Sequence, residues 1–350
     1  MKKSNTKISK DELLILLNTI KPVVAKNDRI PVLQDILMSK GQMSAYNGSC
    51  GMIIDHDMGL MHDMQIPFEK FYVFVKGAKE DIALDLVVNV LTLKSGRSTS
   101  KLPIQSGEDF PEFNFGEEEV IPVKNDIFQE SLKFCSPFAS RKSARYELHG
   151  VYYNDKGSWA TEGQRISNYN YTFVEAEDPP VVIPLELAKI LSDFEFDIDE
   201  IFYDKQKLIA YSDTGITIFG NVIDASEYPK LHEYIPKIKT FINFPKDELK
   251  KGLITVGDFS GDIVEEAECI LNLGETVSIA FAGSTAQIKE VFNFGQEYPE
   301  GSWILNPYHF SVMLDKCDEF AFHSKGKMNI LYGQSENKKF KCVLALQQEK

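Results

Sequence analysis

Three prolines each open a segment in which apolar residues recur three and four positions apart. The segments begin at Pro67, Pro184 and Pro307. This spacing places the apolar side chains on one face of a helix. Proline suits the first turn of a helix, because its missing N–H has no partner there in any case. The pattern therefore predicts three amphipathic helices at nearly equal intervals along the chain.

A second marker precedes each of these prolines at a nearly constant distance. Asp11, Asp126 and Asp247 each stand just before a further run of helical apolar spacing. An acid in the first turn of a helix is favoured by the helix dipole. Two independent markers that keep phase indicate three copies of one module, each with two helices.

Short alternating segments lie between and after the expected helices, and they are bounded by Gly, Asp, Asn and Lys. They cover residues 82–86, 88–94, 201–203, 208–211, 215–218, 320–322 and 330–332. Such segments predict antiparallel meanders, about eight strands to a copy. We therefore expect an α+β fold of three similar tandem domains, each with two helices packed on one face of an antiparallel sheet. With linkers at 115–121 and 234–240, the expected domains are 1–120, 121–237 and 238–350.

Composition narrows the class of protein. Of 350 residues, 43% are hydrophobic and 26% charged, which is typical of a folded chain. The net charge of −14 excludes a uniformly basic coat, although it leaves room for a local basic stripe. No apolar run is long enough for a membrane span, and the start has no apolar signal region. The five cysteines are widely spaced without a CxxC pair, which predicts reduced thiols in a cytoplasmic protein.

One cluster has metal-ligating side chains. It comprises Asp55, His56, Asp57, His62 and Asp63. These ligand types suit zinc or a transition metal, so a metal-dependent hydrolase or nuclease is an alternative, but their spacing matches no helix face. The chain has no phosphate-binding glycine loop and no nucleophile motif. We therefore expect a protein that is not an enzyme and has no cofactor.

Basic residues gather near the predicted helices. They include Lys21, Lys26 and Arg29, then Lys70 and Lys76, then Arg141, Lys142 and Arg145, and finally Lys246, Lys250 and Lys251. Scattered surface lysine explains such groups equally well from pattern alone. If each copy directs its helices toward one shared surface, however, these residues form a stripe that meets phosphates without reading bases. Tandem copies related by equal rotations close into a ring.

Several motifs together resemble a known family. They are residues 29–37 (RIPVLQDIL), 95–98 (SGRS), 102–103 (LP), 108–111 (EDFP), 145–151 (RYELHGV), 161–166 (TEGQRI), 228–236 (YPKLHEYIP) and 343–346 (VLAL). Each motif alone is weak, but their order is similar to that of the bacterial DNA polymerase III beta subunit, the sliding clamp. The resemblance extends over the whole chain and is weakest in the third domain.

The resemblance implies half of a ring, closed by a second copy head to tail around double-stranded DNA. The implied function is to confer processivity on a replicative polymerase by sequence-independent DNA encirclement. The DNA-contacting residues by position are Lys26, Arg29, Lys70, Lys76, Arg145 and Tyr146. Loading onto closed DNA needs a separate ATP-driven clamp loader, since this chain has no nucleotide motif.

The family also binds short peptides of its partner proteins, including the polymerase and the loader. The implied wall of that pocket is Leu148, Thr161, Gly163, Gln164, Arg165, Ile166, Pro229, Tyr234, Val343, Leu344, Ala345 and Leu346. Apolar side chains there suit leucine or phenylalanine anchors. A scaffold or adaptor that kept the fold without these activities is a further alternative.

Departures from the family pattern affect both surfaces. Gln164 replaces the family's pocket histidine, and Ala345 replaces a proline near the end, so the preferred peptides are expected to differ. By resemblance, the dimer seam joins Phe110 and Phe113 to Asp258 and Phe259. A buried aspartate without a partner would weaken that seam by a few kcal/mol.

Overall fold

Helices form where the sequence signals place them. In the computed structural model, α1 (Lys10–Ile20) and α5 (Lys246–Ser260) carry their acids in the first turn, and α3 (Asn125–Cys135) occupies the corresponding place. The helices α2 (Phe68–Gly77), α4 (Leu185–Ser192) and α6 (Pro307–Lys316) follow the three prolines. Pro67 and Pro184 differ slightly from expectation, because each ends a strand and precedes its helix by one residue.

The structure describes residues 5–26, 30–60, 62–113, 115, 121–123, 125–154, 156–170, 180–261, 267–282, 286–295, 298–325 and 328–348. These residues divide into two compact units. Unit 1 comprises Met1–Lys133 and Val181–Asp224, and unit 2 comprises Phe134–Pro180 and Ala225–Lys350. Each unit takes part of the expected middle domain, so the division into three domains stays a prediction.

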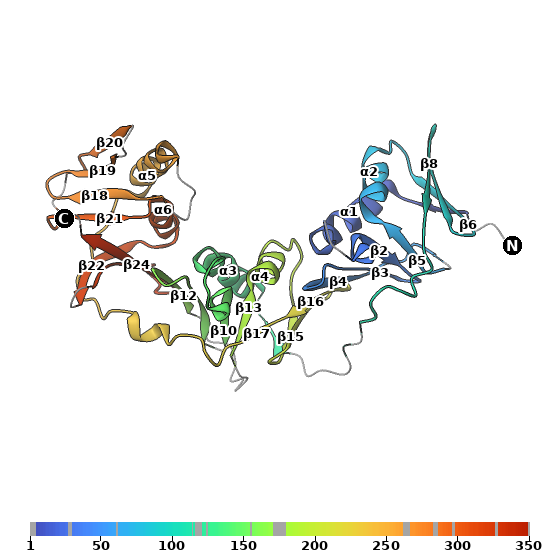
Figure 1. Ribbon diagram of the computed structural model, residues 1–350, viewed down its shortest axis with the longest axis horizontal. Coiled ribbons are helices and arrows are strands. Elements are labelled where there is room, and N and C mark those ends of the chain that lie inside the picture. Colours follow the sequence, from blue (N-terminus) through green and yellow to red (C-terminus); the bar gives the residue numbers. More distant parts are fainter. Residues whose placement is uncertain are drawn as a thin grey trace. The chain divides into compact units, whose positions relative to one another are not determined.

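Unit 1 contains two antiparallel sheets (Figure 1). The smaller has the order β1 (Asn5–Ile8), β6 (Ile82–Val87), β7 (Val90–Ser95), β8 (Ser98–Pro103). The larger has the order β5 (Met64–Pro67), β2 (Asp35–Met38), β3 (Gln42–Tyr46), β4 (Cys50–Asp55), β16 (Ile216–Asn221), β15 (Lys207–Ser212), β14 (Glu200–Tyr203), β9 (Ile121–Pro122). In addition, β13 (Val181–Pro184) pairs with β17 (Ile223–Asp224).

The helices of unit 1 cover its sheets with apolar faces. Leu13, Leu17 and Ile20 recur on one side of α1 and are fully buried. The helices α1 and α2 contact each other as well as strands of the larger sheet. Figure 1 shows the two helices side by side above β2, β3 and β5. The expected helix-on-sheet packing is therefore confirmed here.

Unit 2 is built on a second large antiparallel sheet. Its order is β10 (Gly150–Asn154), β11 (Gly157–Thr161), β12 (Arg165–Asn170), β24 (Phe340–Gln348), β21 (Gly301–Leu305), β18 (Cys269–Leu273), β19 (Val277–Ala282), β20 (Gln287–Phe292). A hairpin of β22 (Glu319–Lys325) and β23 (Met328–Gln334) joins it, because β23 also pairs with β24. The helices α5 and α6 contact each other, and they cover β19, β20 and β24.

Short 3-10 turns connect the elements. They are η1 (Lys21–Val23), η2 (Pro31–Gln34), η3 (Ser136–Phe138), η4 (Tyr146–Leu148) and η5 (Leu231–Tyr234). None of the described helices has both the length and the apolar character needed to cross a membrane. The α+β class with antiparallel sheets, predicted from periodicity, is confirmed.

Candidate functional site

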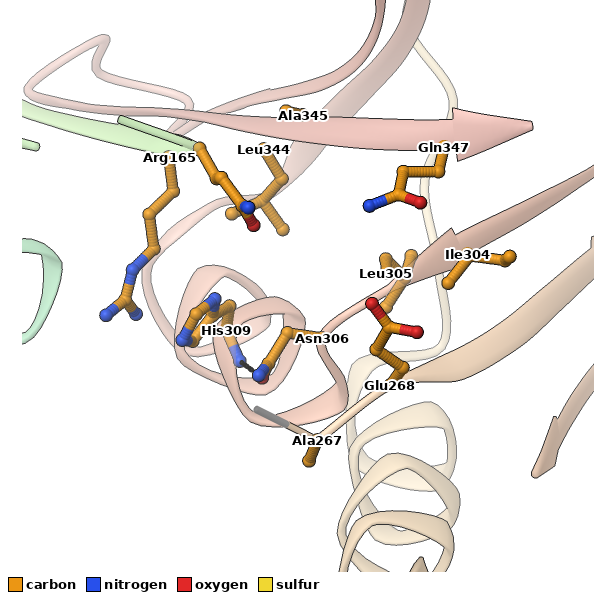
Figure 2. A pocket seen from close by; sticks show the side chains of 11 residues that line it. Arg165, Ala267, Glu268, Ile304, Leu305, Asn306, His309, Leu344, Ala345 and Gln347 are labelled. Atoms are coloured by element: carbon orange, nitrogen blue, oxygen red, sulfur yellow. Dashed lines mark hydrogen bonds between the residues drawn. The ribbon is translucent and has the colours of Figure 1, made fainter. Parts of the chain in front are cut away.

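A pocket opens in unit 2 where one strand changes partners along its length. The first part of β24 pairs with β12, with Arg165 opposite Leu344. The last part of β24 pairs with β21, with Ile304 opposite Gln347. Between these two pairings the Ala345 N–H of β24 donates to the Gln164 carbonyl at 2.7 Å, and a cavity of about 330 Å³ lies beside it (Figure 2). We call it the gap pocket; its lining is Gln164, Arg165, Ala267, Glu268, Ile304, Leu305, Asn306, His309, Leu344, Ala345 and Gln347.

The start of α6 supplies one wall of the gap pocket. Asn306 caps this helix, and its Oδ1 accepts a hydrogen bond from the His309 backbone N–H at 3.0 Å. This cap holds the His309 ring in the pocket wall. The ring is 8% exposed, and its Nε2 has no protein partner among the described residues. Burial and the nearby Arg165 charge lower the pKa of His309 to about 3, so the ring is neutral near pH 7.

A buried ion pair holds one of the lining residues, Arg165. Arg165 Nε lies 2.6 Å from Glu162 Oε1, and the Arg165 side chain is 8% exposed. Its guanidinium also lies over the Phe138 ring, 5.3 Å from the centroid. Thr161 Oγ1 donates to the Arg165 carbonyl at 2.7 Å and accepts from the Gly163 N–H at 3.0 Å. These contacts hold the turn between β11 and β12 in one conformation.

The gap pocket has a mainly polar lining with a smaller apolar part. Ile304, Leu305 and Leu344 provide the apolar surface, and Gln164 and Gln347 contribute side-chain amides. Figure 2 shows Gln347 across the pocket from Glu268. Such a lining suits a segment of polypeptide whose polar groups meet the amides and charged groups. The arrangement offers recognition, and its lining contains no hydroxyl or thiol nucleophile.

The structure divides the predicted peptide wall between two places. Gln164, Arg165, Leu344 and Ala345 line the gap pocket. Thr161, Ile166 and Val343 instead form one row across β11, β12 and β24, since residues directly opposite share a face. The other predicted residues are Leu148 and Leu346, both buried, Gly163, which is exposed, Pro229, which is half-buried, and Tyr234, which is 52% exposed.

Sequence reasoning missed several residues of the pocket. They are Ala267, Glu268, Ile304, Leu305, Asn306, His309 and Gln347. The one available signal was Asn306 before Pro307, which is typical of a helix start. Nothing in the spacing indicates that this helix start faces residues 164 and 165.

The predicted DNA contacts in unit 1 lie around α1 and α2. Lys26 and Lys70 line one cavity of about 420 Å³ together with Lys21. Lys21 and Lys76 lie over the Tyr72 ring, with Nζ 4.3 and 6.0 Å from its centroid. Arg29 lies outside the described residues.

The predicted DNA contacts in unit 2 are differently placed. Arg145 Nε donates to Glu147 Oε1 at 2.7 Å, and its Nη2 donates to the Glu227 carbonyl at 3.0 Å. The Arg145 guanidinium is therefore already compensated by a carboxylate. Tyr146 is 64% exposed.

Of the residues predicted for the dimer seam, those of unit 1 are buried or half-buried within the chain, whereas those of unit 2 are exposed. Phe110 is 4% exposed within unit 1, and it packs near Phe113, whose ring lies 4.5 Å from that of Phe219. Phe110 is thus part of a core cluster, which leaves little of it for a partner. Phe259 is 45% exposed, and Asp258 Oδ1 accepts a hydrogen bond from the Tyr308 hydroxyl at 2.8 Å. In the single chain Asp258 is exposed and has this hydroxyl as a partner, and the cost of burying it in a dimer seam stays a prediction.

The alternative metal cluster is not assembled by the described residues. No group of three or more His, Cys, Asp or Glu side chains that could hold a metal occurs among them. His56 Nδ1 accepts from the Met58 N–H at 3.3 Å, and Asp55 Oδ1 accepts from Gln42 at 3.0 Å. The metal-dependent enzyme receives no support from this segment.

Comparisons with known proteins agree with this architecture. No protein-family model matches the chain. A crystal structure of the beta subunit from the DNA polymerase of Streptococcus pyogenes matches 99% of this chain and 100% of its own, with TM-score 0.85 and 17% identity. This chain has the beta sliding clamp fold. The clamp of Helicobacter pylori, solved bound to a DNA ligase peptide, matches this clamp-fold chain with TM-score 0.81 and 18% identity over 99% of this chain and 100% of the other.

A sequence comparison also finds a clamp. The beta sliding clamp of Streptococcus pneumoniae is 24% identical over 272 residues, which is 70% of this chain and 71% of the relative. The low identity describes a diverged chain that keeps the clamp fold.

Proposed function

We propose that this chain is a DNA sliding clamp, a non-enzymatic processivity factor that encircles duplex DNA and binds short peptides of its partners. The observation that carries this proposal is the match of the whole chain to beta clamp structures, with TM-score 0.85. The chain's work is entropic: a tethered polymerase that dissociates from the primer end rebinds quickly, because its effective concentration there stays high.

Peptide recognition is assigned to the row of Thr161, Ile166 and Val343, together with Ala345, which stands two residues beyond Val343 on the same face of β24. Ile166 and Val343 offer the apolar surface for a leucine or phenylalanine anchor, and the Gln347 amide, on the same face of β24, orients the peptide backbone. The Helicobacter pylori relative, which has this fold, was solved with a DNA ligase peptide bound. The partners proposed for this chain are a replicative polymerase and a clamp loader.

DNA contact is assigned to the basic residues around α1 and α2. Lys26, Lys70 and Lys76 are exposed, and no carboxylate is seen to pair with them in the described part of the chain. Lysines attract phosphates over a distance without reading base edges, so a protein held this way still slides. The predicted contacts Arg29, Arg145 and Tyr146 remain part of this proposal.

Ring closure requires a second copy, arranged head to tail. Two strands, β8 in unit 1 and β20 in unit 2, lie at the ends of their sheets. Sheet edges carry unpaired backbone groups that add another strand readily. One edge on each unit suits a heterologous contact that closes after two copies. Phe259 and Asp258 remain candidates for the side-chain part of the seam, and the domains proposed are 1–120, 121–237 and 238–350.

The decisive test is topological. The protein is loaded onto nicked circular plasmid with a bacterial clamp loader and ATP, and then passed through a gel-filtration column in high salt. A clamp stays with the circular DNA and is lost once the plasmid is linearised. If the protein is lost equally from circular and linear DNA, the result would contradict the clamp function and favour the alternative of an adaptor protein that kept only the fold.

The peptide half of the proposal has a separate test. Ala345 is exposed and stands beside the row on the same face, so Ala345→Trp covers the end of the row without disturbing a buried core. We expect this variant to lose most of its binding to a labelled peptide that carries one leucine and one phenylalanine. The control is Lys251→Glu, an exposed change on α5 that should leave the affinity unchanged.

A further inference from the structure

A second pocket lies on one face of the unit 2 sheet. We call it the lysine pocket. Its volume is about 650 Å³, and it is lined by residues of β11, β12, β22, β23 and β24, by Lys338 in the turn before β24, and by residues of the segment 232–241. The residues used below are Trp159, Asn168, Lys237, Phe241, Lys338 and Lys341.

The lysine pocket continues the row that carries part of the predicted peptide wall. Trp159, Asn168 and Lys341 stand opposite one another on β11, β12 and β24. Thr161, Ile166 and Val343 stand two residues further along the same strands. Residues two apart on a strand share a face, so both rows form one continuous surface. A peptide lying on the wall therefore reaches the lysine pocket without leaving that face.

The pocket has an excess of positive charge. Lys237 and Lys338 are exposed, Lys341 is half-buried, and none of the three forms an ion pair with a carboxylate among the described residues. The one acid in the lining, Glu319, already accepts a hydrogen bond from Gln334 at 2.6 Å. Burial and the charge of Lys338 lower the pKa of Lys341, so an added anion would relieve an existing repulsion.

A buried acceptor in the lining requires a donor. The Oδ1 atom of Asn168 has no hydrogen-bond partner among the described residues, although the side chain is fully buried. Its Nδ2 already donates to the Ser158 carbonyl at 3.3 Å. An unsatisfied buried acceptor is costly, so a ligand that offers an N–H at this point gains affinity. A carboxylate alone has no such donor, whereas a peptide backbone carries one at nearly every residue.

We propose that the lysine pocket binds acidic residues that flank the apolar anchors of a partner peptide. This inference rests on the proposed peptide-binding function, and it names the class of peptide selected. Carboxylates meet Lys237, Lys338 and Lys341, while a backbone N–H of the same segment donates to Asn168 Oδ1. Single-stranded nucleic acid fits less well, because base stacking needs free aromatic faces. Tyr332 is 3% exposed, and the Trp159 and Phe241 rings are half-buried.

The test uses three labelled synthetic peptides with one shared leucine and phenylalanine anchor. Their flanks carry glutamates, glutamines or lysines at the same positions, on both sides of the anchor. Fluorescence anisotropy at low salt should give the glutamate peptide about tenfold tighter binding than the glutamine peptide, which corresponds to two or three exposed ion pairs. The lysine peptide should bind most weakly.

Charge reversal then assigns the preference to the pocket. In the double variant Lys237→Glu and Lys338→Glu, both changes are at exposed positions, so the fold should persist. We expect the glutamate preference to vanish while the glutamine peptide binds as before. The matched control Lys251→Glu, which lies on α5 outside the pocket, should keep the preference.

Each other outcome overturns the inference in a recognisable way. Equal binding of the glutamate and glutamine peptides would end it and leave the proposed clamp function intact. A glutamate preference that survives the double variant would place the effect elsewhere. If no peptide binds, or Ala345→Trp changes nothing, the proposed peptide-binding function fails as well. Oligothymidylate could also be added as a competitor. If it displaces the glutamate peptide from the wild-type protein but not from the double variant, the pocket would be assigned to nucleic acid.

Discussion

Two arginine–glutamate pairs of this chain differ mainly in burial. Arg165 and Glu162 are 2.6 Å apart with side chains 8% and 20% exposed, whereas Arg145, 2.7 Å from Glu147, is 53% exposed. When one partner of a buried pair is removed, the remaining charge is left inside the protein with little water around it. When one partner of an exposed pair is removed, water solvates the remaining charge. Loss of the Glu162 carboxylate should therefore lower the free energy of unfolding more than loss of the Glu147 carboxylate, although the two ion-pair distances are similar.

We predict that Glu162→Gln lowers the free energy of unfolding by about 3 kcal/mol, because the Arg165 guanidinium loses its carboxylate inside the protein. The matched variant Glu147→Gln should cause little change. Urea unfolding of both proteins at pH 7 measures the difference, and equal effects would contradict the role given to burial.

The pH dependence of stability tests the state of His309. Its pKa in the folded chain is about 3, below the ordinary 6.5 expected after unfolding. Between these two pH values the unfolded chain carries a proton on His309 that the folded chain does not. The contribution of His309 to the free energy of unfolding is therefore full above pH 6.5 and is lost as the pH falls toward 3. Between pH 7 and pH 5, the free energy of unfolding of the wild-type protein should fall by about 2 kcal/mol more than that of His309→Gln. Urea unfolding at the two pH values is the measurement, and an unchanged slope would contradict a neutral buried ring.

At the scale of elements, two strand junctions of the chain differ although the predicted repeat would relate them. In unit 2, β12 meets β24, and Glu162 lies 3.9 Å from His309. In unit 1, β4 meets β16, and Asn47 Nδ2 donates to Glu186 at 2.8 Å. Asn47 precedes β4 as Glu162 precedes β12, and Glu186 follows its helix proline as His309 does. In unit 1 a direct hydrogen bond joins Asn47 to Glu186, whereas in unit 2 the corresponding Glu162 and His309 lie 3.9 Å apart and only His309 lines the gap pocket.

The close packing of β11 on β12 gives a prediction about glycine. A Cβ on Gly157 would lie 2.4 Å from the Tyr169 carbonyl oxygen, which is backbone and moves only with its strand. We expect Gly157→Ala to lower the melting temperature, with a loss of about 2 kcal/mol. Gly77 at the end of α2 has no atom within 4 Å of such a Cβ, so Gly77→Ala should be neutral or stabilising. Thermal unfolding followed by circular dichroism compares the two, and similar behaviour would contradict the close approach.

Sequence patterns predicted the helices better than the strand pairing. The spacing of Leu13, Leu17 and Ile20 is enough to place α1, because the signal lies within three turns. The pairing of β12 with β24 joins residues about half the chain apart, and no local spacing specifies that register.

At the scale of the whole molecule, the sheet edges β8 and β20 should control assembly. Val291 on β20 is 58% exposed, and a charge there obstructs the addition of another strand. We predict that Val291→Glu reduces the dimer fraction at low micromolar concentration, as mass photometry would record. The control is Lys205→Glu at an exposed turn of unit 1. A wild-type protein that is a monomer at all concentrations would refute the ring itself.

The lysines around α1 and α2 should set the salt dependence of DNA binding. Each phosphate contact contributes about 0.9 to the slope of log affinity against log salt, so Lys26→Gln with Lys70→Gln should reduce that slope by about 2. Anisotropy of a labelled duplex between 50 and 200 mM salt (roughly the range in which such slopes are resolved) measures it. Lys205→Gln should leave the slope unchanged, and an unchanged slope in the double variant would remove these lysines from the DNA surface.

The amino-acid sequence by itself determined the local elements and the α+β class. Helix periodicity, first-turn acids and prolines act over a few neighbouring residues. They can therefore be recognised directly from the sequence. The same order of motifs supported the resemblance to the sliding clamps, including Gln164 and Arg165 as site residues.

Only the tertiary structure decided which side chains share a surface. The gap pocket exists because β24 pairs with β12 and then with β21, and that change of partner brings His309 beside Arg165. The lysine pocket exists because Trp159, Asn168 and Lys341 stand opposite one another on three strands. Both sites depend on contacts between segments far apart in the chain, whose energies arise from packing and register and not from any local pattern.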